Sequence, residues 1–210
     1  MTYLRDPQAI YRESFARIRR EVDLSRLPPA LHPVALRLVH AAGDPALATQ
    51  LLWSPEAAER GEAALRAGAA VLVDARMVAA GINASLLPKK NRVLCFIDDK
   101  RVWALAQRLG TTRSAAAVEL WRPHLAGAVA AIGNAPTALF HLLELIAAGA
   151  AKPALVLGFP VGFVGAAEAK AALAVNAFGL SFITLPGRRG GSALAAAAVN
   201  ALARPAEDEA

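Results

Sequence analysis

Five short apolar runs punctuate the chain from residue 69 onward, and each is continuous rather than alternating. Continuous runs of this length are typical of strands that are buried on both faces of a parallel sheet. Helix-like stretches separate several of them, and strand–helix alternation indicates a mostly parallel sheet with helices on both faces. The predicted strands are Ala69–Ala75, Arg92–Asp98, Val129–Asn134, Ala154–Pro160 and Ser181–Gly187.

Helical patterns fill most of the remaining chain, and they divide it into an amino-terminal part and a core. Residues 1–52 are predicted to be helical, residues 53–203 to form an α/β core and residues 204–210 to be a polar tail, all within one domain. The predicted helices are Pro7–Val22, Pro28–His40, a short piece after Pro45, Pro55–Ala67, Arg113–Arg122, Thr137–Ala148, Ala166–Phe178 and Ser192–Ala203.

Composition narrows the class of protein. Cys95 is the one cysteine and lies in an apolar run, so we expect a buried strand residue and no intrachain disulfide. The four histidines are scattered, so no metal site is expected. The early residues are polar and charged, and Gly133–Pro136 interrupts the long uncharged stretch Leu125–Leu143. We therefore expect a soluble, cytoplasmic protein without a membrane span.

The net charge is +6, with 23 basic and 17 acidic residues, and no run of Lys or Arg exceeds two residues. Nucleic-acid binding usually requires a denser basic patch. Dispersed arginines suit an acidic small molecule better, because a guanidinium pairs well with carboxylate or phosphate. An ordinary solvated arginine surface is the alternative that charge alone leaves open.

Chemically distinctive residues gather where the predicted strands end. Asp74, Gly133–Thr137, Pro160–Gly165 and Gly187–Ser192 each follow a strand. Parallel sheets bind ligands beyond the carboxyl ends of their strands, so these loops favour a site at that edge. Ordinary turn chemistry is the alternative for each loop taken alone.

Two of these loops suggest different anion sites. Gly158, Gly162 and Gly165 do not have the dinucleotide-binding spacing, so that possibility is weak. Arg188 and Arg189 precede a Gly-Gly-Ser turn that opens a helix, where backbone N–H groups favour a carboxylate or phosphate.

A second helix start carries a cation in an unfavourable place. Thr112 is expected to cap the helix and to leave Arg113 in its first turn, where a positive charge opposes the helix dipole. A ligand or charge partner for Arg113 is one explanation, and exposure to solvent is the other.

His40 ends a predicted helix and precedes Ala41-Ala42-Gly43-Asp44. A helix carboxyl terminus stabilises imidazolium, so we expect a raised pKa that suits a general acid near neutral pH. A plain C-terminal cap is the alternative. The chain contains no G-x-S-x-G, P-loop or H-E-x-x-H motif, which disfavours hydrolases and kinases.

Several segments together resemble the precorrin-8X methylmutase family. They occur in the family's order over nearly the whole chain, and GNAPTALF and PVGFVGAAE are the most specific. The matching segments are IYRESFARIRRE, LRLVHAAGD, VLVDARMVAAGI, TTRSAAAVELW, AIGNAPTALFHLLE, PVGFVGAAEAK and GRRGGSALAAAAVNALAR.

The resemblance implies a flavodoxin-like or Rossmann-like fold, a homodimer and a reaction without a cofactor. That reaction is a 1,5-sigmatropic shift of a methyl group from C-11 to C-12 of a tetrapyrrole corrin precursor, giving hydrogenobyrinic acid. The family's catalytic histidine corresponds to His40, which would protonate a ring nitrogen next to the migration terminus.

The substrate implied by the resemblance is a disc edged with carboxylates, which accounts for the basic charge. Two family positions differ here, since Ala169 replaces a common serine and Ala177-Phe178 replaces Ser-Tyr. The expected substrate-binding residues are Ser14, Arg113, Ser114, Asn134, Thr137, Gly162, Gly165, Gly190, Gly191 and Ser192.

Three alternatives remain open at this point. PVGFVGAAE resembles the branch that acts on metal-free precorrin-8X, and a cobalt-precorrin-8 methylmutase is the alternative within the family. A corrinoid carrier on the same fold would need no general acid. A different α/β enzyme would use the glycine-rich loop for a phosphate.

Overall fold

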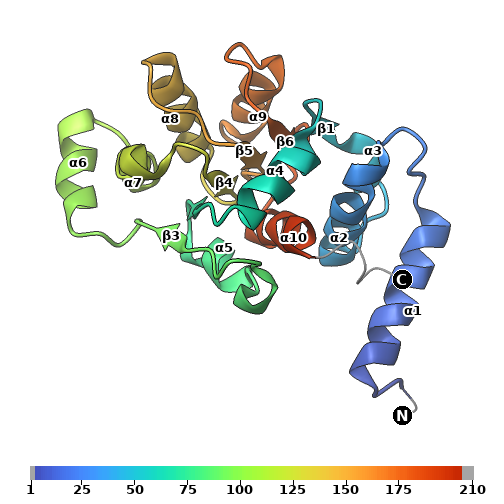
Figure 1. Ribbon diagram of the computed structural model, residues 1–210. Helices are drawn as coiled ribbons and strands as arrows, with labels where there is room; N and C mark the ends of the chain where they lie inside the picture. Colours follow the sequence, from blue (N-terminus) through green and yellow to red (C-terminus); the bar gives the residue numbers. More distant parts are fainter. Residues whose placement is uncertain (1–2, 205–210) are drawn as a thin grey trace.

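The computed structural model describes residues 3–204, and a six-stranded sheet lies at its centre (Figure 1). The sheet order is β1-β6-β5-β4-β2-β3, and every neighbouring pair is parallel except β1 and β6. The strands are β1 (Leu52–Trp53), β2 (Val71–Val73), β3 (Val93–Cys95), β4 (Val129–Ile132), β5 (Leu155–Gly158) and β6 (Phe182–Thr184).

The α/β prediction is confirmed, and all five predicted strands are present. Taken in chain order, these five parallel strands follow the order 2-1-3-4-5, which is the flavodoxin-like arrangement. The expected number of five strands is wrong, because β1 adds a sixth. This strand has two residues and an exposed Leu52, so it produces no apolar run.

The sheet is buried on both faces, as the continuous apolar runs predicted. In β2, Val71 and Val73 belong to one apolar cluster and Leu72 to the other. β4 alternates in the same way, with Ala130 and Ile132 on the second face. Each face of the sheet therefore has its own helical layer.

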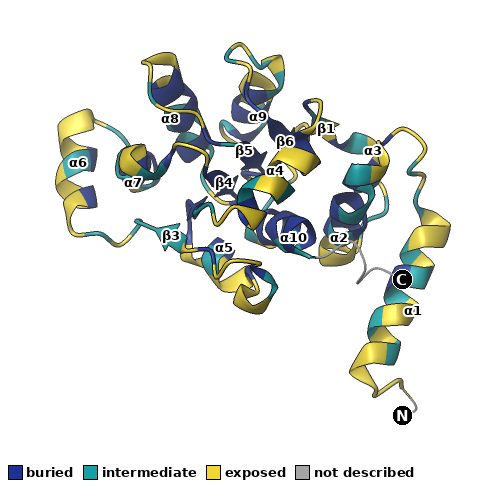
Figure 2. Cartoon of the chain, viewed as in Figure 1, coloured by how far each residue is buried: buried dark blue, intermediate teal, exposed yellow. Residues whose placement is uncertain are grey.

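One helical layer consists of α2 (His32–Ala42), α4 (Ala57–Arg66), α5 (Arg76–Gly81) and α10 (Ser192–Ala203). The other consists of α7 (Arg113–Glu119), α8 (Pro136–Ala147) and α9 (Ala166–Val175). Figure 2 shows that the helices bury the sides that face the sheet. The remaining elements are α1 (Pro7–Glu21), α3 (Leu47–Gln50), α6 (Arg101–Leu109) and three 3₁₀ turns at Pro29–Leu31, Ala84–Leu86 and Arg122–His124.

The sequence pattern did not predict α5 and α6. α5 has six residues, and Val78 is its buried residue. α6 buries Val102 and Ala106 against α7 and leaves Trp103 exposed, so its apolar stripe is narrow.

Cys95 lies in a strand, but it is half-buried rather than buried, because β3 is an edge strand with one neighbour. The predicted polar tail lies outside the described residues from position 205 onward. Among residues 3–204, no helix is long and apolar enough to cross a membrane.

The first helix projects from the rest of the chain (Figure 1). Asp6 caps α1 by accepting hydrogen bonds from the N–H groups of Gln8 and Ala9. Phe15 is the buried residue of α1, and the helix packs against α2. Most of the surface of α1 therefore faces solvent, including Ile10.

Candidate active site

His40 occupies the last turn of α2, as the sequence predicted. The helix ends because Gly43 adopts a left-handed conformation, with φ of 64°, which glycine accepts without steric cost. The Gly43 N–H donates to the carbonyl of Val39 at 2.8 Å. The imidazole of His40 therefore stands at an exposed helix end, followed directly by a turn.

The helix α1 holds this imidazole in place. Ser14 Oγ lies 2.9 Å from His40 Nδ1, and the Phe15 ring stacks on the imidazole with centroids 5.0 Å apart. Neutral His40 can accept from the serine hydroxyl at Nδ1, whereas imidazolium would donate to it. Ser14 and His40, both predicted site residues, thus form a pair that leaves Nε2 for a ligand.

The pKa of His40 is lowered, and the predicted increase is wrong. Partial burial against α1 is the larger cause, and the positive charge of Arg37 is the second. Arg37 lies over the rings of Tyr11 and Phe15 and donates to the Tyr11 hydroxyl at 2.5 Å. A pKa below the ordinary histidine value leaves the free imidazole mainly neutral at neutral pH.

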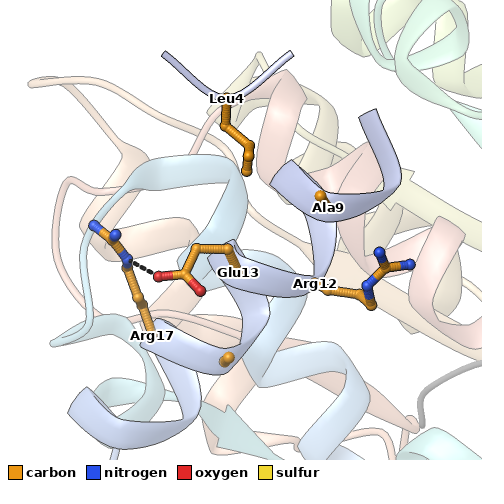
Figure 3. Close-up of a pocket in the computed structure, with 6 residues that line it drawn as sticks. Leu4, Ala9, Arg12, Glu13 and Arg17 are labelled. Carbon is orange, nitrogen blue, oxygen red and sulfur yellow. Dashed lines mark hydrogen bonds and ion pairs between the residues drawn. The ribbon is translucent and has the colours of Figure 1, made fainter. Parts of the chain in front are cut away.

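The space beside His40 is shallow. It is a hollow of about 220 Å³, lined by Ser14, Arg17, Ile18, Glu21, Val39, His40, Gly43 and Pro45. A larger groove of about 580 Å³ lies along α1 and shares Arg17 with this hollow, and Glu13 pairs with Arg17 there (Figure 3). None of the predicted site residues lines that groove, so the smaller hollow is the one that concerns His40.

The carboxyl edge of the sheet contains a second group of predicted residues, and Asp74 organises it. Asp74 follows β2, is 2% exposed and accepts hydrogen bonds from the N–H groups of Gly133, Asn134 and Ala135 at 2.7–2.9 Å. Burial raises the pKa of Asp74, and the three N–H donors oppose that shift. An internal carboxylate thus occupies the amides that follow β4, a position where related folds bind ligands.

The start of α7 lies beside the start of α8. Thr112 caps α7, as predicted, by accepting from the N–H of Ala115, and its hydroxyl is 2.8 Å from that of Thr137. Arg113 has a charge partner in Asp98 at 3.7 Å and donates to the Ile97 carbonyl at 3.1 Å. The structure therefore brings Arg113 and Ser114 close to Thr137.

The two glycine-rich loops also meet at this edge. The Gly162 N–H donates to the Arg188 carbonyl at 3.3 Å, and the Gly191 N–H donates to the Phe159 carbonyl at 2.8 Å. A Cβ on Gly190 would collide with the carbonyls of Phe159 and Pro160, which explains the glycine there. The Gly191 N–H is therefore engaged, and an anion at this helix start would bind the N–H groups that follow it.

One ion pair links the end of α2, the helix of His40, to the β6–α10 loop. Arg189, between β6 and α10, contacts Asp44 at 2.6 Å, and Asp44 directly follows the end of α2. By contrast, α1 and α7 lie at opposite ends of the molecule (Figure 1), so Ser14 and Arg113 are not neighbours within one chain.

Asp74 was recognised at a strand end without its role as a hydrogen-bond acceptor, and no role was predicted for Tyr11, Arg37 or Asp44. The position of Asp74 at a strand end was the available signal, whereas the other three depend on how α1 and the loops pack. Within residues 3–204, no group of three or more His, Cys, Asp or Glu residues is arranged to hold a metal ion.

Comparison with known proteins identifies the family. The model of the precorrin-8X methylmutase family matches residues 9–205. A precorrin-8X methylmutase of Pseudomonas aeruginosa is 58% identical, covering 98% of this chain and 99% of that protein. A cobalt-precorrin-8 methylmutase of Priestia megaterium is 40% identical, covering 93% and 87%.

A solved structure has the same fold over nearly the whole chain. The precorrin-8X methyl mutase of Thermus thermophilus has a TM-score of 0.86 and 42% identity, covering 96% of this chain and 97% of that one. The protein is thus an α/β isomerase. It belongs to the precorrin-8X methylmutase family, whose reaction is part of cobalamin biosynthesis.

Replacing Asp74 with Asn should lower the free energy of unfolding by about 2 kcal/mol, because either orientation of the amide points an NH₂ group at backbone N–H donors. Urea unfolding measures this change. Asp98→Asn is the control, since Asp98 is an exposed surface partner of Arg76 and should cost less than about 1 kcal/mol. Equal losses in the two variants would contradict the anchoring role of Asp74.

The titration of His40 can be followed by NMR in the protein without substrate. We expect a pKa below the ordinary histidine value of 6.5, and Arg37→Gln should raise it by removing a neighbouring positive charge. Arg122→Gln, beyond α7, is the control and should leave the titration unchanged. A His40 pKa that does not respond to Arg37→Gln would show that Arg37 has no electrostatic effect.

Proposed function

We propose that this protein converts metal-free precorrin-8X to hydrogenobyrinic acid by moving a methyl group from C-11 to C-12, with His40 as the proton donor. The hydrogen bond between Ser14 and His40 carries the proposal, because it orients an imidazole that lines a hollow at a helix end. Such orientation is what a general acid requires.

The proton has a defined task in this reaction. Protonation of the ring nitrogen next to the migration terminus withdraws electrons from the conjugated system and lowers the barrier to the shift. The proton returns to His40 afterwards, so the conversion remains an isomerisation. General acid catalysis of this kind contributes roughly 10²–10⁴-fold, and the rest comes from holding the macrocycle in a reactive shape.

The lowered pKa of His40 fits a substrate that carries negative charge. Burial is the larger cause of the lowered pKa and the Arg37 charge is the second, and a carboxylate brought by the substrate would offset that second cause. We therefore propose that His40 acquires its proton as the substrate binds, which limits the acid to the occupied site.

The proposed carboxylate contacts fall into two sets. The loop containing Gly190, Gly191 and Ser192 is tied to the helix of His40 through Arg189 and Asp44, so it would hold the nearer side chains of the macrocycle. Residues of the other loops would contact its more distant rim. They are Arg113, Ser114, Asn134, Thr137, Gly162 and Gly165.

We propose the metal-free substrate rather than the cobalt form. The PVGFVGAAE motif supports this choice, and so does the 58% identity to a protein described as a precorrin-8X methylmutase. Rates measured with both substrates test it, and faster conversion of cobalt-precorrin-8 would reverse the assignment.

Replacing His40 with Ala should reduce turnover of precorrin-8X at least about 100-fold while the protein still binds hydrogenobyrinic acid. Appearance of the corrin chromophore in the visible spectrum measures turnover, and calorimetry measures product binding. His124→Ala is the control, since His124 stacks on Phe96 away from α1. Turnover at the normal rate in His40→Ala would exclude the acid role and favour a different catalytic group.

We also propose that the protein is a homodimer. Tyr3, Leu4 and Ile10 lie exposed along the projecting amino-terminal segment, and an exposed apolar surface of this kind commonly marks a protein contact. Light scattering should give twice the mass of the chain, whereas a monomer at micromolar concentration would refute the proposal.

A further inference from the structure

Lys170 is a buried lysine that the proposed reaction does not use. It lies on α9, is 1% exposed, and its Nζ donates to the backbone carbonyl of Arg189 in the loop between β6 and α10. Burial lowers the pKa of Lys170 to about 8, so this environment disfavours the ammonium. A buried ammonium that donates to one carbonyl is a poor source of stability, which suggests another role.

The carbonyl that Lys170 holds belongs to a residue with a second contact. The guanidinium of Arg189 pairs with Asp44 immediately after the helix of His40. Elsewhere in this loop, the Arg188 carbonyl accepts from the Gly162 N–H, the Gly191 N–H donates to the Phe159 carbonyl, and the Arg188 guanidinium lies over the Phe163 ring. Lys170 is thus the side chain that fixes the backbone of Arg189.

We infer that Lys170 is a positioning residue, which holds the β6–α10 loop so that Arg189 reaches Asp44 and the loop stays docked beside His40. This inference rests on the proposed function for its kinetic consequences only. Without Lys170, the Gly190–Ser192 turn would loosen at the point where substrate carboxylates are proposed to bind.

The space around Lys170 allows a direct test. Lys170 lines a hollow of about 370 Å³ between α9 and the end of β6, together with Ala167, Ala171 and Gly187. Replacing Lys170 with Ala would leave room for a small alkylammonium ion, which could restore the bond to the Arg189 carbonyl. A residue that only fills space would not depend on that charge.

In Lys170→Ala we expect kcat/KM for precorrin-8X to fall roughly 10- to 100-fold, since misplacing groups remote from the reaction costs about this much. KM should rise more than kcat falls, because His40 keeps its bond to Ser14. Propylammonium should restore most of the activity, and propanol, which is similar in size but uncharged, should not. Lys152→Ala is the matched control, because Lys152 also donates to a carbonyl, that of Phe178, but on the surface.

Hydrogen exchange gives a readout that does not need turnover. Amides of residues 187–194 should exchange faster in Lys170→Ala and slow again with propylammonium. Lys170→Met keeps the side-chain volume, and it should show the same faster exchange without a lower melting temperature.

Three results would overturn the inference. The first is normal kinetics and normal hydrogen exchange in Lys170→Ala. The second is rescue by propanol that is as effective as rescue by propylammonium. The third is a lower melting temperature in Lys170→Met with unchanged hydrogen exchange. Wild-type protein that fails to convert precorrin-8X would instead refute the proposed function, and the exchange experiment would still decide the role of Lys170.

Discussion

The three hydrogen bonds of the Asp74 carboxylate are the interaction on which the sheet edge depends. They join the end of β2 to the loop after β4, at the point where the strand order reverses. Gly133, the first of the three donors, packs against Gly191 and Ser192 so closely that a Cβ would not fit. Asp74 therefore fixes the loop after β4, and close packing of that loop fixes the start of α10.

This arrangement separates the protein from the nucleotide-binding members of its fold class. In those proteins, backbone amides near the switch point are available to a ligand, whereas here a carboxylate of the chain itself satisfies them. The amides after β4 are therefore already satisfied, and a ligand at this edge would need other groups to bind it.

Much of the fold could be predicted because burial leaves a direct pattern in the sequence. The run around Val71–Val73 is continuous because both faces are covered, and helices such as α8 and α10 are apolar for the same reason. β1 was not predicted because it has only two residues. α6 was not predicted because it buries only Val102 and Ala106. Among the site residues, Thr112 was predictable from local capping. The pKa of His40 was not, because α1 and Arg37 determine it through tertiary packing.

The thin attachment of α1 has a consequence for the dynamics of the site. This helix supplies Ser14 and Phe15 to His40. Of the residues of α1, however, Phe15 alone is buried. Segments with few buried contacts open locally at a lower free energy than the whole domain unfolds. We therefore expect α1 to detach transiently while the sheet stays folded. The imidazole of His40 would then lose its hydrogen bond to Ser14 and much of its burial at the same time. Its orientation and its pKa are therefore coupled to a local folding equilibrium of α1.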